Sequence, residues 1–79
     1  MRDKSSLDKL KKGQKAIIVD LNSNDIPAKF YEMGFLPGTE IEVKHIAPLN
    51  GPICLNIIAS NSLIAIRKSE AKVIIIDPK

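Results

Sequence analysis

The 79-residue sequence has only one cysteine, Cys54, and one histidine, His45. A single thiol excludes an intramolecular disulfide and a zinc site built from several cysteines. A small domain without such cross-links must be stabilised by tight packing or by self-association, and a homo-oligomer is therefore one expectation. His45 and Cys54 are the candidate metal ligands, but no further ligand pattern accompanies them. We interpret His45 as a packing residue, since it follows Val43 in strand parity, and Cys54 as a structural thiol, and we expect no cofactor.

Aromatic residues, clustered glycines and long apolar runs are also scarce. The three aromatic residues, Phe30, Tyr31 and Phe35, lie close together, which does not favour a base-stacking sheet for nucleic acid. The four glycines are scattered and no Gly-Lys-Ser/Thr occurs, which excludes a phosphate-binding loop. No run approaches the roughly 18 apolar residues that span a membrane, and the N-terminus lacks a signal-peptide core. We expect a cytoplasmic chain without membrane insertion, able to work at the inner face of the membrane.

Charge is modest and uneven. The net charge is +3, and much of the surplus lies in early lysines between residues 4 and 15. We interpret these lysines mainly as a solubilising segment, with contact to nucleic acid or to acidic lipid as the alternative.

The most informative stretch is Met33-Gly34-Phe35-Leu36-Pro37-Gly38. Gly34 suits the left-handed position just after a helix, and Phe35 is placed to pack back on the last turn, where Phe30 is available. Pro37 and Gly38 occupy the second and third positions expected of a type II turn. Alternation of apolar and polar residues begins directly afterwards. These residues therefore predict a helix end, a docked aromatic pair and the start of a strand.

The remaining pattern predicts a mainly β fold. A polar segment rich in N-cap residues leads into a helix in which Ile26, Phe30 and Met33 should face the core. The expected strands cover about 14–21, 39–46, 53–58, 63–67 and 73–76, and the helix covers roughly 25–33. Short strands with close turns indicate a small, strongly bent antiparallel barrel of five to six strands, with one short α-helix between strands one and two.

The domain organisation is simple. Residues 1–6 are polar and are expected to form a disordered tail, and residues 7–79 a single domain. Leu7 and Leu10 are one helical turn apart and Gly13 breaks the turn, so the pair should close one end of the core. The link of residues 47–52 has Asn50-Gly51 between two prolines and should form a stiff, protruding loop.

The order of these segments resembles the FeoA family of bacterial ferrous iron transport. The residues that carry the resemblance are Leu7-x-x-Leu10-x-x-Gly13, Met33-Gly34-Phe35-Leu36-Pro37-Gly38-Thr39, Ala47-Pro48-Leu49 with Pro52-Ile53, and Leu63-x-Ala65-Ile66-Arg67-Lys68-x-Glu70-Ala71. The resemblance implies an SH3-like barrel in the cytoplasm and a functional link to the membrane transporter FeoB, which carries a GTP-binding domain. The same barrel is found in iron-dependent repressors.

Two surfaces are candidates for partner binding. The first combines the helix end with the proline loop through Lys29, Tyr31, Leu36, Pro48 and Leu49. Tyrosine suits interfaces, and a leucine on a rigid loop loses little entropy on docking. The alternative is a surface tyrosine and a loop leucine folded over the core.

The last strand provides the second surface. Apolar residues occupy both of its faces, so one side, Ile74 with Ile76 or the opposite Val73 with Ile75, is expected to form an oligomer or partner interface. The alternative is that helix capping and strand bending bury these side chains within one monomer.

These observations favour a non-enzymatic adaptor of ferrous iron transport over an enzyme. The expected partner is an FeoB-type transporter, through its GTP-binding domain or its membrane part. The alternative is a stand-alone SH3-like domain of a metal-responsive regulator that binds protein segments or a transition metal. A small nucleic-acid-binding barrel is a third class and predicts salt-sensitive binding to oligonucleotides.

Overall fold

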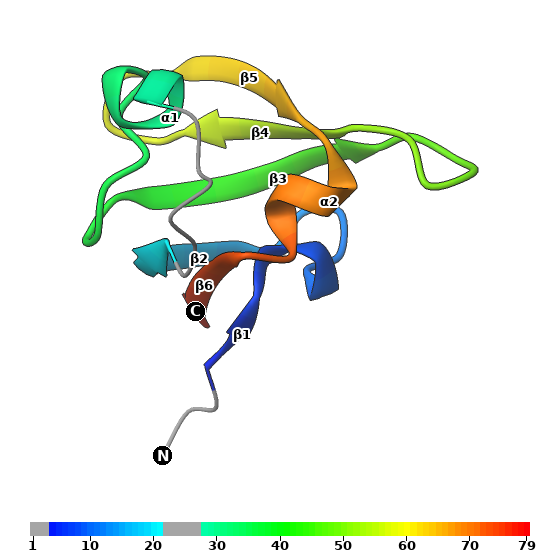
Figure 1. Ribbon diagram of the computed structural model, residues 1–79, viewed down its shortest axis with the longest axis horizontal. Coiled ribbons are helices and arrows are strands. Elements are labelled where there is room, and N and C mark those ends of the chain that lie inside the picture. Colours follow the sequence, from blue (N-terminus) through cyan, green and yellow to red (C-terminus); the bar gives the residue numbers. More distant parts are fainter. Residues whose placement is uncertain (1–3, 22–27) are drawn as a thin grey trace.

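The computed structural model describes residues 4–21 and 28–79, and it is built mainly from short strands (Figure 1). Short apolar and β-branched runs bounded by Gly, Pro, Asn and Ser favour such strands. In chain order the elements are β1 (Ser5–Ser6), the 3₁₀ turn η1 (Leu7–Lys9), β2 (Lys15–Leu21), α1 (Ala28–Glu32), β3 (Glu40–Ile46), β4 (Ile53–Ile57), β5 (Ser62–Ile66), α2 (Lys68–Ala71) and β6 (Ile74–Pro78).

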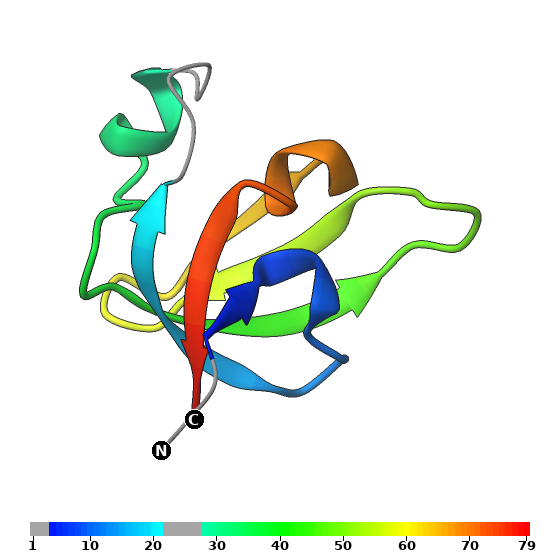
Figure 2. The same cartoon turned by 60° about the horizontal axis from the view of Figure 1, so that its bottom comes forward.

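The six strands form one antiparallel sheet in the order β1-β6-β2-β3-β4-β5. The sheet curls around the core, as Figures 1 and 2 show from two sides. The five strands expected from the sequence are all present, each within two residues of its expected bounds. Within the described residues, no helix is both long enough and apolar enough to cross a membrane.

The N-terminal segment differs from the expected tail. Residues 1–3 lie outside the described part, but Ser5 and Ser6 pair with Ile76 and Ile75 and form β1. The exposed edge of β6 offers backbone hydrogen-bonding groups that a passing extended chain can satisfy, whatever its side chains are. Polarity alone therefore misidentified Ser5 and Ser6 as disordered.

A second helix also replaces an expected turn. The sequence predicts a brief turn at 69–71, whereas α2 forms one short helical turn there. Glu70 Oε1 accepts a hydrogen bond from the backbone N–H of Arg67 at 2.9 Å, which satisfies one of the unpaired donors at the start of a helix. Ala71 is fully buried and attaches this turn to the core.

The end of α1 has the geometry that the sequence predicts, although residues 25–27 of the expected helix lie outside the described part. Gly34 has φ +95°, its N–H donates to Tyr31 O at 3.2 Å, and the Phe35 N–H donates to Phe30 O at 2.9 Å. These are the two hydrogen bonds of a Schellman motif. The rings of Phe30 and Phe35 lie 5.6 Å apart and both are fully buried. The left-handed glycine thus directs the chain from the helix toward β3.

The turn that follows is also confirmed. Gly38 has φ +96°, and the Thr39 N–H donates to Leu36 O at 3.0 Å, as a type II turn requires. The Gly38 N–H donates to Ile18 O at 2.7 Å, which fixes the turn on β2. This attachment places the start of β3 beside β2.

The core lies inside the curled sheet and corrects one prediction. Ile74 and Ile76, expected at an interface, are both 0% exposed and belong to the core cluster. Strand β6 pairs with β1 along one edge and with β2 along the other, and the side chains of its inward face pack in the core cluster. The opposite pair, Val73 and Ile75, is partly buried. The inward half of the apolar excess therefore serves packing, whereas an interface through Val73 and Ile75 stays a prediction.

Candidate functional site

The structure separates the surface that the sequence predicts as one. Tyr31 belongs to α1 and Leu36 follows it, whereas Pro48 and Leu49 lie in the loop between β3 and β4. In both views α1 lies at one end of the molecule and the β3–β4 loop projects from the other (Figures 1 and 2). The side chain of Lys29 lies outside the described part. The helix end and the loop are thus two distinct candidate surfaces.

The β3–β4 loop is a tight hairpin turn with an unusual residue at its tip. Leu49 and Asn50 have φ +58° and +59°, and the Gly51 N–H donates to Pro48 O at 3.1 Å. Positive φ at both central positions defines a type I′ turn, which prefers Asn-Gly because a leucine is strained there. Leu49 is nevertheless held in this turn with 98% of its surface exposed. Neither packing nor backbone preference explains a leucine at this position.

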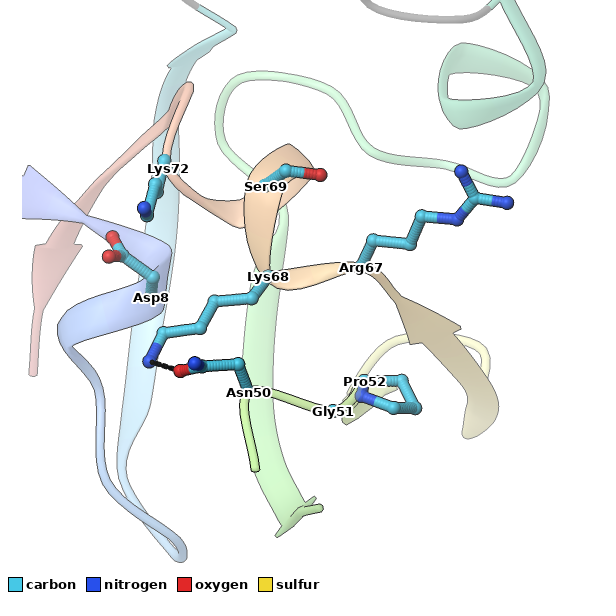
Figure 3. A pocket seen from close by; sticks show the side chains of 8 residues that line it. All are labelled: Asp8, Asn50, Gly51, Pro52, Arg67, Lys68, Ser69 and Lys72. Atoms are coloured by element: carbon cyan, nitrogen blue, oxygen red, sulfur yellow. Dashed lines mark hydrogen bonds between the residues drawn. The ribbon is translucent and has the colours of Figure 1, made fainter. Parts of the chain in front are cut away.

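The same loop also contacts α2. Lys68 Nζ donates to Asn50 Oδ1 at 3.1 Å (Figure 3), and the Ala47 N–H donates to Pro52 O at 3.0 Å across the hairpin. A groove of about 850 Å³ lies at this junction, and we call it the basic groove. It is lined by Asp8, Asn50, Gly51, Pro52, Arg67, Lys68, Ser69 and Lys72.

The α1 end carries a different groove. About 660 Å³ in volume, it is lined by Glu32, Met33, Gly34, Leu36, Gly38, Thr39, Glu40 and residues 57–60. Leu36 and Tyr31 are 46% and 45% exposed. This end therefore offers apolar atoms beside the acidic Glu32 and Glu40, whereas the basic groove offers cations.

His45 corrects a further expectation. The register of β3 on β4 shifts between Val43, opposite Leu55, and His45, opposite Cys54. This β-bulge adds a residue to β3 and reverses the side-chain parity, so His45 is exposed instead of packing with Val43. His45 and Cys54 are cross-strand neighbours on the outer face, but the described residues contain no group of three or more metal-ligating side chains.

Sequence reasoning missed most of the basic groove. Arg67 and Lys68 were noted, but Lys72, Ser69 and Asp8 were not associated with them or with the loop. The contact between Asn50 and Lys68 spans 18 residues. Lys68 begins α2 and Lys72 directly follows it, so their spacing of four residues was a signal that both lie on one side of this turn.

Leu63 is a second missed feature. It lies in β5, at the edge of the sheet, and is 70% exposed. Leu63 alternates with the half-buried Ile64, and strand alternation predicts that one of the two is exposed. Because both residues are apolar, the sequence did not indicate which one.

Comparison with solved structures identifies similar folds. Iron(II) transport protein A from Clostridium thermocellum is 39% identical, with a TM-score of 0.82 over 92% of this chain and 44% of that chain. A FeoA-like protein from Clostridium acetobutylicum is 28% identical, with a TM-score of 0.84 over 99% of this chain and 90% of that chain. The zinc complex of Stenotrophomonas maltophilia FeoA, a prokaryotic SH3 domain protein, is 28% identical, with a TM-score of 0.72 over 91% of this chain and 88% of that chain.

A manganese-dependent transcriptional repressor has the same fold at 15% identity, with a TM-score of 0.87 over 100% of this chain and 38% of that chain. The sequence matches none of the curated proteins with which it was compared. The fold is SH3-like, as the resemblance implied. The model of the FeoA domain matches residues 5–78, nearly the whole sequence. The chain therefore belongs to the FeoA family, which takes part in ferrous iron transport.

Proposed function

We propose that this chain is a cytoplasmic, non-enzymatic accessory protein that binds an FeoB-type ferrous iron transporter and modulates its gating or nucleotide cycle. Membership of the FeoA family supports the link to ferrous iron transport. A small domain that performs no chemistry can change a transporter only by binding one of its states more tightly than another. The proposal therefore requires a surface built for docking.

The observation that carries this proposal is Leu49. A large apolar side chain is held 98% exposed on a backbone with φ +58°, where leucine is disfavoured by roughly 1–2 kcal/mol. Strained residues persist where the surrounding structure fixes them, and they cluster at functional sites. A fixed leucine at the tip of a hairpin can enter an apolar pocket of a partner with little loss of conformational entropy.

Replacement of Leu49 by asparagine separates stability from binding. Asparagine tolerates positive φ, so Leu49→Asn is expected to raise the free energy of unfolding by up to about 1 kcal/mol. The same change removes the apolar contact and should weaken partner binding about tenfold. Urea unfolding measures the first effect. Titration of labelled protein with the soluble GTP-binding domain of the transporter, with and without nucleotide, measures the second by NMR.

Leu36→Asn is the matched control, because it makes the same chemical change at the α1 end. Shifts centred on the β3–β4 loop, dependent on nucleotide and weakened in Leu49→Asn alone, are the expected result. Loss of binding in Leu36→Asn alone would move the docking surface to α1. Unchanged affinity in both variants would refute docking through either leucine.

The regulator alternative has less support. Likeness to the manganese-dependent repressor at 15% identity concerns the fold, whereas the family match concerns ferrous iron transport. Binding of the transporter domain would favour the adaptor function directly.

A further inference from the structure

The basic groove combines three segments that are distant in the sequence. The β3–β4 loop contributes Asn50, the segment around α2 contributes Arg67, Lys68 and Lys72, and η1 contributes Asp8 (Figure 3). The loop contacts α2 through the hydrogen bond from Lys68 to Asn50, which places this side of the groove next to the exposed Leu49.

The cations of this groove have no acidic partner within the described residues. In the described part of the chain, the ion pairs join Lys44 to Glu42 and Lys79 to Glu40, outside the groove. Arg67, Lys68 and Lys72 take part in neither, and Asp8 is the one carboxylate in the lining. Ser6 Oγ donates a hydrogen bond to Asp8. The groove therefore has an excess of positive charge that attracts negatively charged groups.

The arrangement of the cations argues against a compact anion. In Figure 3 the side chain of Arg67 extends away from those of Lys68 and Lys72, so the three charges are spread along the groove instead of converging on one point. A phosphate is best bound by donors that meet at a single position. Spread charges suit an extended ligand that carries several separate carboxylates.

The lining also argues against a lipid surface. The site is concave, and it includes the Asp8 carboxylate and the Ser69 hydroxyl beside the cations. A membrane surface is broad and flat, so it would favour a convex basic face. A peptide fits this chemistry, because Asp8 can accept a hydrogen bond from a backbone N–H while the cations hold its acidic side chains.

We propose that the basic groove binds an extended acidic segment of the partner protein, with Leu49 contacting an apolar residue at the rim of the groove. The inference rests on the proposed function, since it names the chemistry of the partner segment. Charge complementarity of this kind determines specificity and the association rate more than the final affinity.

The experiment measures how tightly the full chain binds a short fluorescent peptide that has Asp at alternate positions. Fluorescence anisotropy gives the affinity, and NMR shifts are expected at Asn50 and in α2. Raising ionic strength should weaken binding, because the screening length falls from about 30 Å at 0.01 M to about 10 Å at 0.1 M. The variant Arg67→Gln/Lys72→Gln is expected to lose about fivefold in affinity.

Lys4→Gln/Lys15→Gln is the matched control, because it removes the same charge from exposed lysines outside the groove. Equal loss in both double variants would show general charge attraction and overturn the inference. Binding of inorganic phosphate at the same residues would also overturn the inference. So would binding of phosphatidylglycerol vesicles by a protein that does not bind the peptide.

Titration with the transporter's GTP-binding domain distinguishes the two proposals. If that domain binds but the groove variant binds it normally and the peptide does not bind, the inference fails and the proposed function stands. If the peptide binds in the groove and neither this domain nor the intact transporter in detergent binds the chain, the groove is an acidic-peptide site and the proposed function fails. If the chain binds neither the GTP-binding domain, nor the intact transporter, nor the peptide, both the proposed function and the groove inference are refuted.

Discussion

Replacing Phe35 by alanine is expected to remove a large part of the free energy of unfolding. Phe35 is fully buried and packs against Phe30 at the point where α1 joins the sheet. Deleting a buried phenylalanine ring costs about 3–5 kcal/mol. A domain of 79 residues has a total stability of about 4–12 kcal/mol, so the variant should lose from about a quarter of that stability to all of it.

Tyr31→Ala, in α1, provides the control. Tyr31 is 45% exposed, so its truncation should change the midpoint of urea unfolding much less. Far-UV circular dichroism followed through urea titration gives both values. Equal losses in the two variants would show that the Phe30–Phe35 contact does not anchor α1.

Ile76→Glu should also abolish folding, and it decides between the core and the interface interpretation of this residue. Ile76 is 0% exposed and lies opposite Ile18, which is also 0% exposed. An ionised carboxylate placed there without a partner is penalised by several kcal/mol, because it loses its hydration. The expected outcome is loss of the cooperative unfolding transition.

Leu63→Glu introduces the same charge on β5, where the side chain is 70% exposed. This variant should fold normally, because the carboxylate remains in water. A folded Ile76→Glu protein with an altered oligomeric state, measured by light scattering, would return Ile76 to an interface and contradict the burial described above.

Local patterns in the sequence determined the strands and the end of α1. The left-handed position at Gly34, the aromatic contact and the turn at Gly38 each depend on residues within a few positions of one another, so their geometry follows from backbone preference. The alternation in β3 likewise predicts which side of the strand is buried. FeoA membership was also accessible from these ordered motifs.

Tertiary structure alone decided the positions of the surfaces. The bulge before His45 reverses its direction, because strand register is set by pairing with β4 and not by β3 itself. Burial of Ile74 and Ile76 depends on the neighbours that the sheet order gives β6. The separation of Tyr31 from Leu49 and the joining of Asn50 to Lys68 are also long-range outcomes. The sequence by itself thus determined the elements and the family, whereas contacts between distant segments decided which side chains remain available to a partner.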